Sequence, residues 1–185
     1  MRIIGGECRG RRLASVGKGD VGAHLRPTAD RVRESLFNML AGGFGDPCRG
    51  AVVLDLFAGT GALGLEALSR GAGRATFVEN GRVALRLLRD NIGICRVAER
   101  TRVVQRDARK LGECPGDAAT LVFLDPPYGK QMGEAALGAA LAGGWIAEGA
   151  LIVWEESAGV SAPEGLTLLD ERRYGDTVIR IFENG

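Results

Sequence analysis

Short, nearly continuous runs of apolar residues alternate along most of the chain with segments in which apolar residues recur at helical spacing. Near-continuous runs indicate strands that are buried on both faces, as in a parallel sheet covered by helices. The pattern therefore predicts an α/β fold in which helices connect parallel strands. The predicted strands span residues 51–57, 74–79, 100–107, 120–125 and 150–156, and the predicted helices span residues 62–70, 83–92 and 132–144.

The C-terminal part of the chain breaks this alternation. Residues 166–183 predict two strands joined by a short connection around Tyr174–Asp176, with no helix between them. The parallel sheet is therefore expected to finish in a hairpin.

The segment before the first strand has a different pattern again. Residues 26–43 predict a helix that Thr28 caps and that Gly42 and Gly43 end. The glycine-rich residues 1–25 predict a short hairpin followed by a polar loop. We expect a single domain, with a basic arm or hairpin at residues 1–27 and an α/β core at residues 28–185. The apolar positions that give the helix its spacing are Val32, Leu36, Met39 and Leu40.

Composition narrows the class of protein. The 185 residues are 45% hydrophobic and 25% charged, which is ordinary for a globular protein. No apolar run approaches the roughly 20 residues that a membrane span requires, and the basic N-terminus lacks the apolar stretch of a signal peptide. We therefore expect a cytoplasmic protein with no membrane association, and as a separate expectation we take it to be a monomer. The four widely spaced cysteines and the single histidine predict neither a metal site nor disulfides.

Charge is unevenly distributed along the chain. Residues 1–33 contain eight Arg or Lys and three acids, a net charge of +5, whereas the remainder carries −4. A basic arm on a mildly acidic domain favours a polyanionic partner such as a nucleic acid over a solubilising tail.

A glycine-rich loop follows the first predicted strand. Gly59, Gly61 and Gly64 form the pattern G-x-G-x-x-G between a strand and a helix. In that context the glycines let the backbone approach a nucleotide at the carboxyl end of the strand. Phe57, Gly59 and Gly61 are therefore candidate cofactor-binding residues.

Asp55 indicates which kind of nucleotide cofactor the glycine loop binds. A dinucleotide would place its pyrophosphate at the helix N-terminus, as in a nucleotide-dependent oxidoreductase, and a carboxylate four residues before Gly59 would repel it. S-adenosyl-L-methionine carries an ammonium and a sulfonium and no phosphate. The acid therefore favours S-adenosyl-L-methionine as the cofactor.

Acids end four successive predicted strands, at Asp55, Glu79, Asp107 and Asp125. Because the carboxyl ends of parallel strands meet at one edge of a sheet, we expect these acids to line one crevice. Glu79 is a candidate acceptor for both ribose hydroxyls, and Asp107 or its neighbouring backbone is a candidate partner of the adenine amino group. For each acid alone, a helix cap or a solvated loop residue is an equally good interpretation.

The fourth predicted strand ends in the sequence Asp125, Pro126, Pro127 and Tyr128. The two prolines stiffen the backbone, so that the carboxylate of Asp125 and the carbonyl of Pro126 become two acceptors in fixed positions. Two acceptors match the two hydrogens of an exocyclic amine, and Tyr128 offers a face on which a base can stack. These four residues are the candidate catalytic site for methylation of such an amine.

Six stretches together resemble a known family. The stretches "VLDLFAGTGALGLEALSRGA", "FVE" and "LDPPY" are similar to class I S-adenosylmethionine-dependent methyltransferases that act on amino groups. The stretches "MRIIGGECRGRRL", "LRPTADRVRESLFNML" and "RYGDT" narrow the resemblance to the bacterial 16S ribosomal RNA guanine-N2 methyltransferase family of the RsmD type. The resemblance covers essentially the whole chain.

The resemblance implies a Rossmann-like, mostly parallel seven-stranded sheet with helices on both faces and the last strand inserted antiparallel. It implies methylation of the N2 amine of a guanine in 16S rRNA, in the small ribosomal subunit or an assembly intermediate. It also implies that Thr28 and Arg31 close over the cofactor. The basic arm would contact RNA phosphates through Arg9, Arg11 and Arg12.

Other functions remain open at this point. An adenine-N6 methyltransferase acting on DNA or RNA would use the same four residues at 125–128. A non-catalytic RNA-binding protein that retains the cofactor pocket is a second alternative, which the intact Asp125–Tyr128 stretch disfavours. The chain length leaves little room for a separate target-recognition domain, which favours a substrate whose own shape provides specificity.

Overall fold

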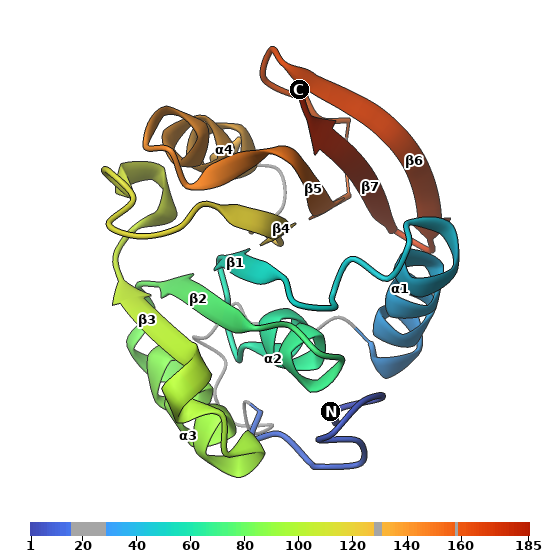
Figure 1. The fold of residues 1–185 in the computed structure, drawn as a ribbon, viewed down its shortest axis with the longest axis vertical. Helices are drawn as coiled ribbons and strands as arrows, with labels where there is room; N and C mark the ends of the chain where they lie inside the picture. The colour runs from blue at the N-terminus through green and yellow to red at the C-terminus, as the bar shows by residue number, and fades with distance from the viewer. Residues whose placement is uncertain (16–28, 128–130, 158) are drawn as a thin grey trace.

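The computed structural model describes residues 1–15, 29–127, 131–157 and 159–185. A seven-stranded sheet in the order β3-β2-β1-β4-β5-β7-β6 forms its centre (Figure 1). The first five strands in this order are parallel, and β7 lies antiparallel between β5 and β6. The strands are β1 (Val52–Leu56), β2 (Arg74–Glu79), β3 (Thr101–Gln105), β4 (Ala119–Leu124), β5 (Ile146–Glu156), β6 (Leu166–Tyr174) and β7 (Thr177–Asn184).

Helices cover both faces of the sheet. One face packs against α1 (Asp30–Gly43), α2 (Ala62–Ser69) and α3 (Arg82–Cys95), and the other packs against α4 (Met132–Ala142). Figure 1 shows α4 on the opposite side of the sheet from the other three. Two short 3-10 helices, η1 (Ala98–Arg100) and η2 (Ala108–Lys110), flank β3. The predicted architecture, including the antiparallel last strand and the terminal hairpin, is confirmed.

Strand side chains alternate between two buried clusters, as the nearly continuous apolar runs predict. Val53, Phe123 and Val153 face α1, α2 and α3, whereas Leu54, Leu124 and Trp154 face the α4 side. The register pairs Asp55 of β1 with Phe77 of β2 and Phe123 of β4. Because paired residues of parallel strands share a face, the acids on these strands can be assigned to faces of the sheet.

The N-terminal segment packs against α2. A single antiparallel bridge joins Arg2 to Arg12 in the described part of this segment. The carboxylate of Glu66, fully buried on α2, accepts hydrogen bonds from the backbone N–H groups of Ile4 and Gly5, each at 2.8 Å. A buried carboxylate needs such partners to offset its loss of hydration.

Two arginines complete the surroundings of Glu66. The buried Arg33 of α1 lies 3.6 Å from a Glu66 oxygen, and Arg70 at the end of α2 lies 2.8 Å from the other. This network joins the arm, α1 and α2 through side chains that the apolar pattern does not reveal.

Gly6 allows the closest approach of the arm to α2. Its backbone has φ +74°, and a Cβ atom there would lie 1.7 Å from the carbonyl oxygen of Ser69. The neighbouring N–H of Glu7 donates to that same oxygen at 2.8 Å. Only glycine satisfies both the dihedral angle and the contact.

Two boundaries differ from the sequence predictions. Ala29, rather than Thr28, occupies the N-cap position of α1, and it makes no side-chain cap hydrogen bond. Strand β5 begins at Ile146 and not at residue 150, with a register shift against β4 between Ala119 and Leu121. Thr28 itself, and most of the predicted polar loop, lie outside the described residues. Within the described part of the chain, we find no helix with the length and apolar character of a membrane span.

Candidate active site

Three of the four predicted acids lie on one face of the sheet, toward the carboxyl ends of neighbouring strands. Asp55 is the fourth residue of β1, Glu79 ends β2, and Asp125 directly follows β4. The register places all three on the face covered by α1, α2 and α3. Asp107 follows the end of β3 by two residues and caps η2.

The glycine loop connects β1 to α2 beside these acids. Gly59 and Gly61 have φ +56° and +80°, which a residue with a Cβ adopts only with strain. A Cβ at Gly61 would lie 2.4 Å from the Cδ1 atom of Leu88. The loop therefore combines a left-handed backbone with tight packing against α3.

Gly64 brings α2 into direct contact with Asp55. Its N–H donates to the Oδ2 atom of Asp55 at 2.9 Å, and a Cβ there would lie 2.5 Å from Phe77. Asp55 is 2% exposed. Burial is the main reason that the pKa of Asp55 rises to about 7, the Gly64 hydrogen bond lowers it, and the charge of Glu79 raises it further.

Phe57 turns the chain out of β1 with φ +59°. A bulky aromatic residue in the left-handed region is strained by about 1–3 kcal/mol, and such strain is typical of ligand-binding loops. The next residue, Ala58, donates from its N–H to the carbonyl of Val78 at 3.0 Å, which holds the loop against β2.

The carboxylate of Glu79 holds two loops together. One oxygen accepts from the N–H of Gly59 at 2.8 Å, and the other accepts from Asn80 and Gly81 at 2.9 and 2.7 Å. Each carboxylate oxygen can accept more than one hydrogen bond. The contact between Glu79 and ribose hydroxyls stays a prediction.

Asp107 has a partner two residues away. Its carboxylate accepts from the backbone N–H of Arg109 at 3.0 Å and forms an ion pair with that guanidinium at 2.6 Å. These interactions, the side-chain hydrogen bond above all, lower the pKa of Asp107. Asp107 therefore caps a short helix, which is one of the interpretations that the sequence allows for it. A contact between Asp107 and adenine stays a prediction.

Asp125 lies in an acidic environment at the end of β4. Burial raises the pKa of Asp125 well above its usual range, and the charges of Glu155, Asp55 and Glu156 raise it further. Pro126 is buried and Pro127 is exposed, whereas Tyr128 lies outside the described residues. The structure therefore places the carboxyl group and the stiff dipeptide at the rim that carries Asp55.

Glu155 and Glu156 are site residues that the sequence reasoning missed. Both are buried at the end of β5, with exposures of 6% and 7%. Glu156 accepts from the N–H of Ser157 at 2.8 Å. The sequence carries a signal for them, because the fifth predicted strand ends in Glu155 and Glu156 just as the first four end in acids.

The remaining predicted site residues lie on the surface. Arg31 is exposed in the first turn of α1. Arg9 and Arg12 are exposed on the arm, whereas the half-exposed Arg11 donates to the carbonyl of Ile94 at 2.6 Å. Their roles in cofactor and RNA binding stay predictions.

Solved structures place this geometry within a known fold. The Escherichia coli protein yhhF, provisionally named a methyltransferase, aligns with a TM-score of 0.84 at 38% identity, covering 100% of this chain and 97% of that one. The Haemophilus influenzae protein HI0767, provisionally named a methylase, aligns with a TM-score of 0.77 at 31% identity, covering 99% and 97%. The fold is that of the Rossmann-like class I methyltransferases.

Sequence comparisons extend over nearly the whole chain. Ribosomal RNA small subunit methyltransferase D of Escherichia coli K12 is 39% identical over 99% of this chain and 89% of its own length. A Bacillus subtilis protein provisionally named rRNA methyltransferase YlbH is 35% identical over 99% of this chain and 98% of its own length. The family model described as "Conserved hypothetical protein 95" matches residues 1–183. The chain therefore belongs to that family, which is the family of the RsmD-type methyltransferases.

Proposed function

We propose that this protein transfers the methyl group of S-adenosyl-L-methionine to the exocyclic N2 amine of a guanine in 16S rRNA. The observation that carries the proposal is the position of Asp125 and Pro126, which directly follow β4 on the rim that holds Asp55 and the glycine loop. The relatives named ribosomal RNA small subunit methyltransferase D support the substrate class.

The residues at the rim fit S-adenosyl-L-methionine. The buried carboxylate of Asp55 favours a cation and disfavours a phosphate. Gly59 and Gly61 leave the backbone open to an adenosyl group. The cofactor supplies an electrophilic methyl group when bound, and Asp55, Gly59, Gly61 and Glu79 are the residues that would hold it.

Asp125 and the Pro126 carbonyl would orient the target amine. An exocyclic amine is a poor nucleophile because its lone pair is delocalised into the ring. Two acceptors for its hydrogens favour a pyramidal nitrogen with a localised lone pair. The raised pKa of Asp125 also makes this carboxylate a better proton acceptor as the amine gains its methyl group.

Guanine is favoured over adenine by two features. The arm and the "RYGDT" stretch resemble guanine-N2 methyltransferases. In addition, Glu155 provides a buried carboxylate beside Asp125. Guanine carries an N1–H donor next to its N2 amine and adenine carries an acceptor next to its N6 amine, so paired carboxylates suit guanine.

The direct test is transfer of labelled methyl groups to small ribosomal subunits that lack N2-methylguanine, followed by nucleoside analysis. Labelled N2-methylguanosine is the expected product. Labelled N6-methyladenosine would instead support the adenine alternative, and the absence of any product would contradict the proposal. A parallel reaction with naked 16S rRNA distinguishes a particle substrate from a free RNA substrate.

A further inference from the structure

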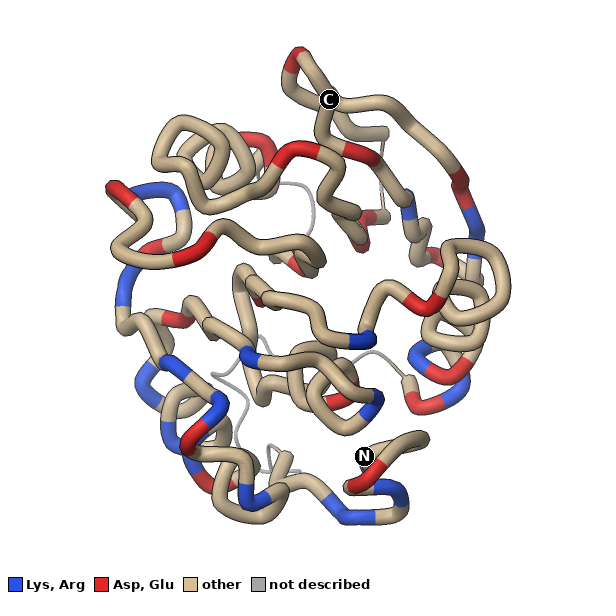
Figure 2. Tube along the Cα trace, viewed as in Figure 1, with Lys and Arg blue, Asp and Glu red and all other residues tan. Residues whose placement is uncertain are grey.

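A second basic segment lies far from the N-terminal arm in the sequence. Residues 82–110, which form α3, η1, β3 and η2, carry nine Arg or Lys and three acids, a net charge of +6 on a chain whose total is +1. Figure 2 shows these basic positions gathered along α3 and β3. The chain outside this segment and the arm is therefore strongly acidic.

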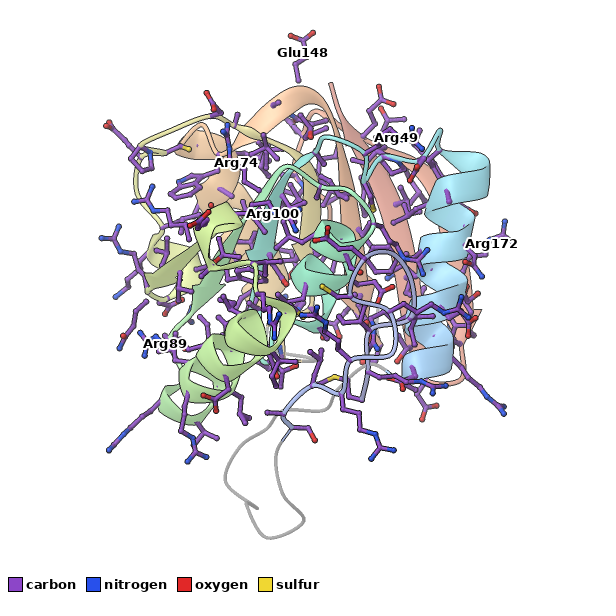
Figure 3. The ribbon with its side chains drawn as sticks, turned by 60° about the horizontal axis from the view of Figure 1, so that its bottom comes forward. Arg49, Arg74, Arg89, Arg100, Glu148 and Arg172 are labelled. Carbon is purple, nitrogen blue, oxygen red and sulfur yellow. The ribbon has the colours of Figure 1, made fainter. Side chains whose placement is uncertain are left out.

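The basic residues of α3 form a stripe. The helix buries Leu85, Leu88 and Ile92, whereas Arg82, Arg86 and Arg89 are exposed at spacings of four and three residues. These spacings place the three arginines on one face, along about 10 Å of helix at 1.5 Å per residue. Arg96, just after the helix, extends the stripe, and Figure 3 shows Arg89 pointing away from the body of the protein.

These arginines lack the acidic partners that are common elsewhere in the protein. Arg49 lies 3.6 Å from Asp46, and Arg172 lies 3.0 Å from Asp170. Within the described residues, by contrast, no ion pair involves Arg82, Arg86, Arg89 or Arg96 of the stripe, or Arg102 of β3. Asp90 is the single acid within α3. Like charges at this spacing repel one another, and a bound polyanion would offset that repulsion.

The arm continues this surface on one side. Arg11 donates to the carbonyl of Ile94 in α3, and the N–H of Ala14 donates to Asn91 at 2.7 Å. On the other side, a hollow of about 280 Å³ lies at the amino ends of the strands, away from the acids of the candidate active site. Its lining includes Arg102, and also Arg74 and Arg100, which form ion pairs with Asp117 and Glu7.

The acidic site gives a physical reason for a separate anchoring surface. Asp55, Asp125, Glu155 and Glu156 crowd the rim where the target base must enter, and they repel phosphate. Attraction for an RNA backbone must therefore come from another part of the protein. Contacts to phosphate fix position and orientation without reading sequence, which suits arginines at a distance from the target.

We propose that Arg82, Arg86, Arg89, Arg96 and Arg102, here called the α3 basic surface, bind phosphates of the folded rRNA that surrounds the target nucleotide. The proposal rests on the proposed function for the identity of the RNA. Arginine suits this role because its guanidinium binds phosphate through two parallel hydrogen bonds. The ribosomal particle would then be held at this surface while a single base reaches Asp125.

The test compares two double variants with equal loss of charge. The first is Arg86→Gln/Arg89→Gln, and the control is Arg49→Gln/Arg172→Gln. Figure 3 shows Arg49 and Arg172 on the side of the molecule opposite Arg89. Arg82 is left intact because it directly follows Asn80 and Gly81, whose N–H groups donate to the candidate cofactor-binding residue Glu79. Gln has nearly the helix propensity of Arg, and melting temperature and S-adenosylmethionine affinity verify that each variant is folded.

The measurement is the dissociation constant for small subunits, and the KM for their methylation, over a range of salt concentrations. The first variant should bind about tenfold to hundredfold more weakly at 0.1 M salt, with a log–log salt slope shallower by about 2, while kcat at saturation is unchanged. The control should match the wild type. Equal salt slopes and KM values in the two variants would overturn the proposal. Weaker binding with an unchanged slope would assign the surface to a ribosomal protein and would also overturn it.

The same experiment separates this inference from the proposed function. If the wild type methylates small subunits and the first variant behaves as the control does, the inference fails and the proposed function stands. If the wild type transfers no methyl group but the first variant binds rRNA more weakly with a shallower slope, the surface stands and the proposed function fails.

Discussion

Asp125 and Glu155 lie side by side at the carboxyl ends of β4 and β5. The two strands pair at Leu124 and Trp154, and each of these residues directly precedes one of the acids. Glu155 is the carboxylate that contributes most, after burial, to the raised pKa of Asp125. Two neighbouring carboxyl groups resist simultaneous ionisation, and such pairs are common at functional sites.

Glu155→Gln should shift the pH dependence of catalysis. Removal of the Glu155 charge lowers the pKa of Asp125, and methyl transfer requires the ionised Asp125. The acid limb of the single-turnover rate against pH should therefore move to lower pH. Glu148→Gln is the control, because Glu148 is exposed on the same strand and points into solvent (Figure 3). An unchanged acid limb in Glu155→Gln would show that the two carboxyl groups are not coupled.

Asp125→Ala should lower the rate of methyl transfer by about 10²–10³, by analogy with the removal of one preorganised hydrogen-bonding group from an active site. The affinity for S-adenosylmethionine should change little. Because the substitution removes an acid from beside Asp55 and Glu155, the melting temperature should not fall. Single-turnover kinetics and calorimetry measure these quantities. Undiminished turnover would remove Asp125 from the mechanism.

Cofactor affinity should depend on pH through Asp55. Its pKa is about 7, so the carboxyl group is largely neutral in acid, and a cationic ligand favours the ionised form. Affinity for S-adenosylmethionine should therefore rise as pH approaches about 7 and level off above it, with proton release on the acid side. Asp55→Asn should flatten this dependence, whereas Asp107→Asn should leave it unchanged. Titration calorimetry at several pH values tests both variants.

The same pKa has a consequence for stability. In the absence of ligand, the folded state binds the Asp55 proton more tightly than the unfolded state does. The contribution of Asp55 to stability is therefore present in acid and decreases as pH rises from 3.8 toward about 7. Asp55→Asn should remove this part of the pH dependence of the melting temperature.

Gly64→Ala should destabilise the protein by about 1–3 kcal/mol, the typical cost of overpacking. The new Cβ would lie 2.5 Å from Phe77 and 3.0 Å from the Asp55 oxygen, so cofactor affinity should also fall. Gly93→Ala is the matched helical control, because open space surrounds that position, and it should stabilise α3 by up to about 1 kcal/mol. Urea unfolding measures both. Equal stability of the two variants would contradict the tight contact at Gly64.

Gly6→Ala should separate the arm from α2. Gly6 and Gly10 both have positive φ, but only at Gly6 would a Cβ meet the Ser69 carbonyl, whereas Gly10 faces open space. Gly10→Ala should therefore cost only the backbone strain of about 1–2 kcal/mol, and Gly6→Ala should cost clearly more. Hydrogen exchange of the Ile4 and Gly5 amides reports the detachment. Full protection of these amides in Gly6→Ala would contradict the docking.

Local patterns predicted most of the fold. Apolar runs located the strands because burial on both faces leaves a continuous signature in one segment. Because the apolar runs define where the strands end, the glycine loop and Asp125–Pro127 could be assigned to the ends of β1 and β4. Two predicted boundaries were wrong. Ala29 replaces Thr28 as the N-cap of α1, and strand β5 starts four residues before the predicted start.

The sequence by itself therefore determined the elements, their parallel arrangement and the residue types of the candidate site. Only the tertiary structure decided that Glu155 adjoins Asp125, that Glu66 holds the arm, and that the arm lies against α3. The physical reason is that these contacts join residues far apart in the chain. They depend on strand order, register and helix docking, which are fixed by the packing of the whole core and leave no pattern within a single segment.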